Sequence, residues 1–543
     1  MTPFIYSAQS SRIIFGAGSL AGLPAELEVL GLSKVLVLTT PQQAALGEQV
    51  ATLLATSSIG VCSGAVMHVP IEAAVKARAV AARLGPDGCI TVGGGTTLGL
   101  AKAIALNSSP PYSMTITSGM NAIAHGGGGA PRAGRRAATK QLKQGEHRGQ
   151  TRMTTIRSSD VDLYCDNSLF EPYRNYEAIR ALGAVVYLAK LGMYVSGRYE
   201  VVKEILSRPD VFISGNGVMM NDTVNNVFKG GIGLCTDGSE HARIRRVEAR
   251  PLSPRALGGL RDTITLEANA LVERLVHRGS FDAATELAQH LPLAIVSNLV
   301  GLPEEGRERM LEWAAANFDS FGPLNDRATT ALDTFQEMYN YAMTQCVRGK
   351  LKPGSWAEML HDAADNREIS DNEARLMALS YVAPSLDTTI FAIGSAIWLF
   401  ANNPDQWQLL RDDPSLIPSA INEILRMESP IQGFSRYAVA DHEFDGVTLP
   451  ADSRVIVLFG SANRDERRWA NPEAFDIRRE GVARHLAFGY GEHACIGLNL
   501  AKLEMAALFS ALAATVSSFE CVSSERVLNN TLRGFRHLDV RVR

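Results

Sequence analysis

The chain has 543 residues, of which 46% are hydrophobic and 20% are charged, and its formal net charge is -4. This length exceeds what one hydrophobic core usually supports, so we expect two or more domains. The balance of charge is typical of a globular protein and gives no reason to expect nucleic acid or a membrane as a partner. The opening MTPFIYSAQSSRIIFGAG lacks the basic and apolar regions of a signal peptide, so we expect a cytoplasmic protein.

Residues 4 to about 106 alternate short β-rich runs, such as KVLVLTT, with Ala-rich helical stretches, such as EAAVKARAVAARLG. This alternation is typical of a parallel sheet flanked by helices, so we expect an α/β module over residues 1–125. Residues 126–152 are poor in apolar side chains and carry seven Lys or Arg against one Glu. They predict a flexible linker, with a basic arm for nucleic acid as the less favoured alternative.

From Met153 onward helical periodicity dominates, interrupted by a β-like section around HEFDGVTLPADSRVIVLFG. This pattern predicts a large, mainly helical domain over residues 153–543. Its longest apolar run, LMALSYVAPSLDTTIFAIGSAIWLF, is interrupted by Pro384, Asp387 and two threonines. We therefore expect a buried core helix with a functional break rather than a membrane span.

Cys495 is one of seven widely spaced cysteines, and no C-x-x-C pair indicates zinc or a redox dithiol. It belongs to F-x-x-G-x-x-x-C-x-G, formed with Phe488, Gly491 and Gly497, just before a stretch with helical spacing. Glycines let backbone N–H groups approach the sulfur, and a helix N-terminus also favours a thiolate. One thiolate without a second nearby ligand suits heme iron better than zinc. The alternative is a buried structural thiol in a Gly-rich turn.

This loop resembles the heme-binding signature of the cytochrome P-450 family, and further motifs follow in that family's order. The resemblance implies a mainly α fold with a small β section that binds heme b, with Cys495 as axial iron ligand and Phe488 and Gly497 as cofactor contacts. Four residues match positions that contact the heme propionates, namely His241, Arg245, Arg436 and His493. Three match a buried ion network that fixes the fold, namely Glu423, Arg426 and Arg479. Taken singly, each of these has an ordinary surface residue as its alternative.

The stretch VAPSLDTT resembles the family's acid–alcohol pair on its long central helix. The resemblance implies that Thr388 supplies the alcohol and Asp387 the acid that deliver protons during dioxygen activation. Pro384 and Ser385 stand where the family usually has Ala-Gly, and a proline inside a helix costs about 3 kcal/mol unless the helix is already distorted. We expect Pro384 to reinforce an opening of the helix. The alternative is a threonine bonded to its own helix and an acid paired with a surface base.

ANFDSFGPLND, GSANRDERRW and NNTLRG resemble segments of bacterial cytochromes P-450 that oxidise para-substituted benzoic acids, often by O-demethylation. The resemblance implies a small aromatic substrate in an apolar pocket, with Phe318, Phe321 and Phe391 as candidate walls or as plain core. Asn216 stands where those relatives use an Arg for the carboxylate, so a neutral phenol or methoxyarene becomes competitive. Because the chain has no evident flavin or iron–sulfur module, electrons are expected from NAD(P)H through a separate ferredoxin and ferredoxin reductase.

Near the N-terminus, RIIFGAGSL and VGGGTTLGLAKAIAL resemble the start of maleylacetate reductases, relatives of iron-containing alcohol dehydrogenases. Gly93, Gly94 and Gly95 at a strand end predict a weak dinucleotide site or a tight structural turn. TSGMNAIAH resembles a later helix of that family. The catalytic domain expected after His125 is replaced by GGGG, so residues 1–125 are expected to form a truncated, Rossmann-like α/β module.

Three functional classes are compatible with these motifs. The favoured one is a heme-thiolate monooxygenase that inserts an oxygen atom from dioxygen into a small aromatic substrate. The second is a nicotinamide-dependent reductase resembling maleylacetate reductase, which its missing catalytic half makes less favoured. The third is a degraded fusion that binds heme or dinucleotide without turnover. We also expect residues 1–152 to be dispensable for the heme chemistry, and a natural start at Met153 is one explanation.

Overall fold

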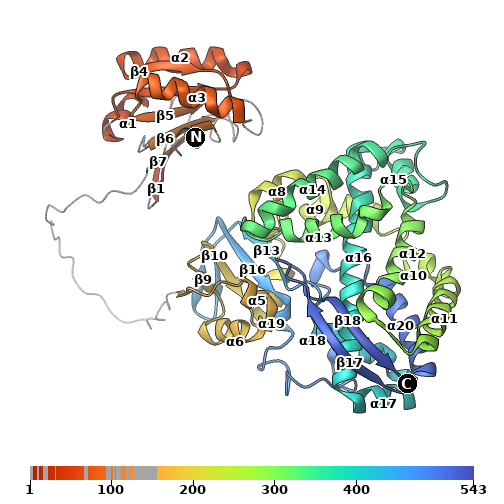
Figure 1. Ribbon diagram of the computed structural model, residues 1–543. Coiled ribbons are helices and arrows are strands. Elements are labelled where there is room, and N and C mark those ends of the chain that lie inside the picture. Colours follow the sequence, from red (N-terminus) through yellow and green to blue (C-terminus); the bar gives the residue numbers. More distant parts are fainter. Residues whose placement is uncertain are drawn as a thin grey trace, which may run out of the picture. The chain divides into compact units, whose positions relative to one another are not determined.

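The computed structural model describes residues 4–8, 11–15, 23–30, 32–65, 71–92, 100–101, 104, 112–117, 121–126 and 156–543. The chain divides into two compact units, Met1–Glu146 and His147–Arg543 (Figure 1). Each unit has hydrophobic core clusters of its own.

The first unit contains a seven-stranded sheet in the order β1-β2-β7-β6-β5-β3-β4. The strands are β1 (Phe4–Ala8), β2 (Ser11–Phe15), β3 (Val35–Thr39), β4 (Ser58–Cys62), β5 (Gly88–Val92), β6 (Tyr112–Thr117) and β7 (Asn121–Gly126). The helices include α1 (Leu23–Leu30), α2 (Ala44–Leu54) and α3 (Ile71–Leu84). Val35 and Val37 of β3 pack with α1 and α2, whereas Leu36 and Leu38 pack with α3. Because successive side chains of a strand point to opposite faces, the sheet is covered on both.

The predicted parallel sheet is found in part. Strands β4, β3, β5 and β6 are parallel, but β1, β2 and β7 pair antiparallel. The segment expected to be a helix, Asn121–Gly126, is strand β7. Only three residues separate β6 from β7 and two separate β1 from β2, and such short connections allow hairpins but no parallel crossover. Gly93, Gly94 and Gly95, and nearly all of the expected linker, lie outside the described residues.

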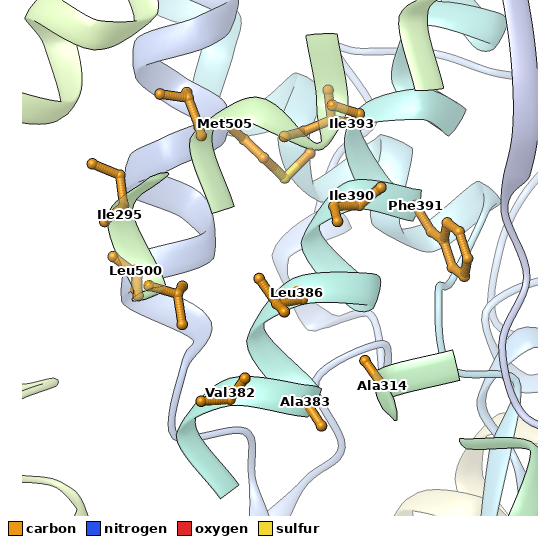
Figure 2. Packing of buried hydrophobic residues seen from close by; sticks show 14 of the residues in the cluster. Ile295, Ala314, Val382, Ala383, Leu386, Ile390, Phe391, Ile393, Leu500 and Met505 are labelled. Atoms are coloured by element: carbon orange, nitrogen blue, oxygen red, sulfur yellow. The ribbon is translucent and has the colours of Figure 1, made fainter. Parts of the chain in front are cut away.

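The second unit is mainly helical and is organised around α16 (Asp371–Asn402). Ser370 begins this helix with a capping box in which its hydroxyl accepts from the Glu373 N–H and the Glu373 carboxylate accepts from the Ser370 N–H. Seven α-helices pack against α16, namely α12 (His290–Val300), α13 (Met310–Ser320), α14 (Asp326–Gln345), α15 (Trp356–Asp365), α17 (Pro404–Asp412), α18 (Ile417–Met427) and α20 (Leu498–Thr515). In Figure 2, Ile295 and Leu500 lie on one side of α16, whereas Phe391 points away from them.

Pro384 does not end the central helix, because α16 is helical throughout residues 371–402, and a local opening at this residue stays a prediction. Proline removes one backbone donor, and the extensive packing of α16 offsets this loss. By length and apolar composition α16 and α20 could each cross a membrane, but most of the apolar window of α16 is buried within the protein, as in the core helix of a globular domain.

Shorter elements surround this helical core. The other α-helices of this unit are α5 (Asp166–Phe170), α6 (Tyr173–Leu182), α7 (Tyr199–Ser207), α8 (Asp222–Phe228), α9 (Gly238–Glu248), α10 (Pro254–Gly258), α11 (Arg261–Arg278) and α19 (Phe459–Ala462). A six-stranded sheet contains, in order, β11 (Phe212–Ile213), β13 (Gly433–Ala438), β16 (Ser453–Leu458), β10 (Met193–Ser196), β9 (Val186–Leu188) and β8 (Arg157–Ser159). A hairpin joins β14 (His442–Phe444) and β15 (Val447–Leu449).

A three-stranded sheet near the C-terminus joins distant parts of the second unit. It contains β12 (Ser280–Asp282), β18 (Phe535–Val542) and β17 (Phe519–Arg526) in that order. Phe281 is opposite Val540 in the antiparallel pairing of β12 with β18, and Val542 N–H donates to the Gly279 carbonyl over 2.9 Å. The last described strand is therefore the central strand of this sheet.

Candidate active site

Cys495 lies in a tight loop between a 3-10 turn, Gly491–His493, and the start of α20. Its N–H donates to the Phe488 carbonyl over 2.8 Å, which closes the loop. Gly491 has a φ of 73°, and a Cβ added there would lie 2.5 Å from the Leu206 carbonyl oxygen. Only glycine therefore allows the loop to pass this close to α7.

The Cys495 side chain is exposed to a cavity, although surrounding protein shields it from bulk solvent. Burial raises the pKa of the Cys495 thiol, while the N–H groups of Gly497 and Leu498 and the Arg245 guanidinium act in the opposite direction. Two backbone N–H groups and the Arg245 guanidinium of α9 thus favour the thiolate, but they do not outweigh the burial of the sulfur. A bound cation at the sulfur would select the thiolate form.

The cavity above Cys495 contains about 1540 Å³ free of protein atoms, counted with its opening to solvent. Its lining combines residues of the cysteine loop with residues of α13 and α16, and most of its side chains are apolar. Phe488 and Ile496 lie beside the cysteine, and Thr388 and Pro384 are contributed by α16. Sequence segments more than 100 residues apart therefore form one cavity beside a single thiol.

Two predicted anion contacts, Arg436 and His493, are buried without a hydrogen-bonded anion. Arg436 is 4% exposed, donates to the Ser435 carbonyl over 2.9 Å, and forms no ion pair with any described carboxylate. Burial lowers the pKa of Arg436 to about 10. His493 Nε2 is buried without a hydrogen bond, 3.5 Å from Glu492 Oε1 and 3.8 Å from Asp237 Oδ1. Burial also lowers the pKa of His493, to about 4.

The other two predicted contacts, His241 and Arg245, support the same side of the cavity in different ways. Arg245 lines the cavity and donates to the Ala494 carbonyl. His241 does not line it, because its ring nitrogens contact the Gly233 and Glu492 carbonyls at 2.9 and 3.2 Å. Its ring lies 4.1 Å, between centroids, from that of His493. Arg245, Arg436 and His493 therefore offer donors suited to carboxylates in the cavity, with His241 behind them.

The predicted acid and alcohol lie next to each other on α16 but differ in their access to the cavity. Thr388 lines it, and its hydroxyl donates to the Pro384 carbonyl over 2.6 Å. Asp387 is buried and does not line it, and its Oδ2 atom has no hydrogen-bond partner among the described residues. Burial raises the pKa of Asp387 to about 8, and the carboxylate of Asp319 on α13 acts in the same direction. Burial therefore favours the protonated form of Asp387.

Aromatic side chains form one wall of the cavity. Phe318 and Phe321 line it as predicted, with ring centroids 5.5 Å apart. Phe228 and Phe434 also line it, 6.2 and 6.4 Å from Phe321, and the sequence analysis did not identify them. Phe391 does not line it, because its ring packs against Gly534, where a Cβ would lie 2.1 Å from Phe391 Cγ. Isolated phenylalanines such as Phe228 and Phe434 carry no spacing signal that could have marked them.

Comparison with known proteins identifies the family of the second unit. The cytochrome P-450 family model matches residues 322–534. Cytochrome p450 CYP199A2 of Rhodopseudomonas palustris is 36% identical over 391 residues, which cover 70% of this chain and 93% of that protein. The chain belongs to the cytochrome P-450 family.

Two further similarities agree with this assignment. A steroid C26-monooxygenase of Rhodococcus jostii is 28% identical over 401 residues, covering 70% of this chain and 83% of that protein. The solved structure of cytochrome P-450 CREJ in complex with (4-ethylphenyl) dihydrogen phosphate is 26% identical and has a TM-score of 0.62, covering 69% of this chain and 98% of that one. In the first unit, the model of iron-containing alcohol dehydrogenases matches residues 10–128.

Cytochromes P-450 are monooxygenases that bind heme b, and the cavity fits this group. A thiol faces the cavity, and the buried guanidinium of Arg436 has no anion bonded to it in the described part of the chain, while His493 Nε2 has no hydrogen bond there. Cys495 would hold the heme iron through its sulfur, and the bound heme would supply the activation of dioxygen, which a thiolate ligand favours. The acidic propionates of the same group would complete the hydrogen bonding of these donors.

A buried ion network below the cavity joins the three residues that the sequence analysis grouped. Glu423 accepts from Arg426 at 2.7 and 2.9 Å and from Arg479 at 2.9 and 3.1 Å. Glu423 and Arg426 have no exposed surface. Arg426 also donates to the Asn463 and Pro472 carbonyls. These hydrogen bonds connect α18 with the segment that precedes the cysteine loop.

A second buried network was not predicted. Glu428 accepts from Arg526 at 2.8 Å and from Arg533 at 3.1 Å, and Arg464 lies 3.2 Å away. Burial alone would raise the pKa of Glu428, but the guanidiniums of Arg526, Arg533 and Arg464 lower it to about 2. These residues are separated by up to 105 positions, so no local pattern relates them.

Glu423→Ala is expected to lower the free energy of unfolding by about 3–5 kcal/mol, because Arg426 keeps its burial and loses its counter-ion. Urea unfolding of the heme-loaded protein, followed by the Soret band and by circular dichroism, measures the change. Glu312→Ala is the matched control, since Glu312 pairs with Arg309 at 2.6 Å on the surface, where such pairs contribute less than about 1 kcal/mol. Equal midpoints for the two variants would contradict the assigned role of the buried network.

Proposed function

We propose that this cytochrome P-450 hydroxylates or O-demethylates a small, neutral aromatic substrate, using electrons from a separate ferredoxin and its NAD(P)H-dependent reductase. The observation that carries the proposal is the combination of an aromatic wall with the absence of any spare cation in the described lining of the cavity. Arg245 and Arg436 are the lining residues with a fixed positive charge, and both belong to the side with His493. If they bind the heme propionates, no guanidinium is left for a substrate carboxylate.

The loop before α8 supports a neutral substrate. Asn216 is exposed and does not line the cavity. The nearest guanidinium, that of Arg454, donates to the Met219 carbonyl over 2.6 Å and pairs with Asp222 at 2.7 Å. Arg454 is thus already neutralised. Any carboxylate in the aromatic part of the cavity would be desolvated without a counter-ion, which is unfavourable.

We assign the following roles within this function. Cys495 is the axial ligand, and Phe488 and Gly497 flank it. Arg245, Arg436 and His493 hold the propionates, with His241 supporting His493. Asp387 stores a proton, and Thr388 presents a hydroxyl at the cavity surface one residue later, so the two form a route for protons into the site. Phe318 and Phe321 position the aromatic ring of the substrate. We place the protein in the cytoplasm.

The test is a pair of ligands that differ in charge. We expect 4-ethylphenol to perturb the heme spectrum with a dissociation constant no higher than that of 4-ethylbenzoate, and a ferredoxin-supported reaction to yield an oxidised phenol. The carbonyl spectrum of the reduced protein must first show the red-shifted Soret band of thiolate-ligated heme. Much tighter binding of the benzoate would refute the neutral substrate and indicate a cation that enters the site on binding.

A shortened chain beginning at Met153 is expected to bind heme and to oxidise the same substrates as the full chain, because residues 153–543 include every proposed site residue of this function. Heme content and turnover with the same ferredoxin measure this. A chain beginning at Pro172 is the control: it lacks β8 and α5, and with them buried Leu163 and Tyr164, so its stability is expected to fall. Loss of heme from the Met153 chain alone would show that the first unit is part of the working enzyme.

Residues 10–128 match the model of iron-containing alcohol dehydrogenases, so a second activity, the NAD(P)H-dependent reduction of maleylacetate, can be tested. Oxidation of NAD(P)H by the full chain, dependent on maleylacetate and independent of heme, would establish it. We expect none, because the match ends at residue 128 and residues 322–534 belong to a different family.

A further inference from the structure

The aromatic wall of the cavity contains a buried amide without a partner. Asn317 lies on α13, is 4% exposed, and lines the cavity. Its side chain forms no hydrogen bond with any described residue. Its amide atoms retain some accessible surface, although the residue as a whole is buried. The amide therefore opens onto the cavity and is unsatisfied by the protein.

The direction of Asn317 follows from helical spacing. Residues three and four apart share a helix face, so Ala314, Asn317, Phe318 and Phe321 lie on one side of α13. Figure 2 shows Ala314 beside Ala383 of α16. Asn317, one turn later, lies on the α16 side together with the two phenylalanines that line the cavity.

Two neighbouring polar side chains of the cavity already have partners. The Ser380 hydroxyl donates to the Leu376 carbonyl at 3.3 Å, and the Thr388 hydroxyl donates to the Pro384 carbonyl. The Asn317 amide instead has both a donor and an acceptor available. Because buried polar groups are nearly always hydrogen-bonded, this amide requires a partner from outside the chain.

We propose that the Asn317 carboxamide is a specificity-determining group that hydrogen-bonds a neutral hydroxyl or ether oxygen of the aromatic substrate. The inference rests on the proposed function and deepens it, because it selects arenes with one polar substituent over plain alkylarenes. A neutral amide matches a neutral partner, since it brings no charge to balance a carboxylate. The phenylalanines hold the ring, and Asn317 sets which end of the ring faces α13.

The experiment compares 4-ethylphenol with ethylbenzene, which differ by one hydroxyl group, by titrating the heme spectrum. In the unsubstituted protein we expect the phenol to bind about 2- to 10-fold more tightly than ethylbenzene, the range of one neutral hydrogen bond. In Asn317→Leu and Asn317→Ala the two dissociation constants are expected to become about equal. The two variants change the cavity volume in different ways, so a loss common to both reports the hydrogen bond rather than the space.

Met338→Leu is the control, because Met338 lines the same cavity without a polar hydrogen-bonding group and the exchange nearly conserves volume. It is expected to retain the ratio. The carbonyl spectrum confirms that each variant retains thiolate-ligated heme. A ratio near one in the unsubstituted protein, or a ratio unchanged in both Asn317 variants, overturns the role of Asn317 while leaving the neutral aromatic substrate intact. If neither compound perturbs an intact heme spectrum, the proposed substrate class fails and the inference fails with it.

Discussion

Cys495→Ser is expected to lose both monooxygenase activity and the carbonyl spectrum of thiolate-ligated heme. A serine hydroxyl supplies no thiolate to the iron, so the electron push that favours O–O cleavage is absent. The fold is expected to remain, because the loop is held by the N–H of residue 495 and by Gly491 rather than by the sulfur. Circular dichroism, heme content and ferredoxin-supported turnover separate these effects.

Cys495→His tests the same point with a ligand that can still bind iron. It is expected to retain heme with a carbonyl spectrum of the imidazole type and to lack activity. Cys521→Ser is the control, because the Cys521 sulfur lies on β17, away from the cavity, and its closest polar contact is the Ser523 carbonyl at 3.8 Å. Coupled turnover by either Cys495 variant would show that the iron ligand has been assigned wrongly.

Asp387→Asn is expected to make the protein more stable and a poorer catalyst. The pKa of Asp387 is raised to about 8 by burial, against an ordinary value of 3.8. Between these two values the folded protein holds a proton that the unfolded chain has released, so the free energy of unfolding falls as pH rises from about 4 to 8. Asparagine has no such proton. The variant is therefore expected to gain up to about 1.4 kcal/mol over the unsubstituted protein for each pH unit in this window.

The catalytic loss is expected to reach about 100-fold in product formation, because a positioned acid contributes at least that factor. Thr388→Ala is expected to retain heme and substrate binding while diverting reducing equivalents to hydrogen peroxide. Glu504→Gln is the matched control for Asp387→Asn. Burial also raises the pKa of Glu504 to about 8, and this residue does not line the cavity. It is expected to reproduce the gain in stability without the loss of coupling. Unchanged coupling of NADH oxidation to product in the Asp387 variant would refute the proton route.

Local spacing made part of this site predictable. The cysteine loop and the acid–alcohol pair each lie within about ten residues, so the sequence itself displays the glycine that the backbone needs at Gly491 and the adjacent Asp387 and Thr388. The cavity wall could not be predicted in the same way. Phe228, Phe434 and Asn317 come from three separate segments, and their shared surface depends on how α8, α13 and β13 pack.

The fold shows the same division between local and long-range information. Helical periodicity after Met153 and the alternating elements before residue 106 follow from local patterns, and the structure has helices and strands there. The antiparallel pairing of β1, β2 and β7 follows from the short connections between strands. A resemblance between motifs gives no information about these connections. The continuity of α16 through Pro384 depends on the seven α-helices around it, and Phe391 faces Gly534 for the same tertiary reason.

The central place of β18 in its sheet has a consequence for synthesis in the cell. Its partner β12 is translated about 255 positions earlier, and until Phe535–Val542 have left the ribosome the edge of β12 has no strand to pair with. The apolar residues of β18, including Leu538 and Val540, complete the main core. Until they are translated, the helices made earlier keep part of their apolar surface exposed. Pairing of β12 therefore waits for β18 to emerge, and a supply of chaperones during synthesis is expected to raise the yield of heme-loaded protein.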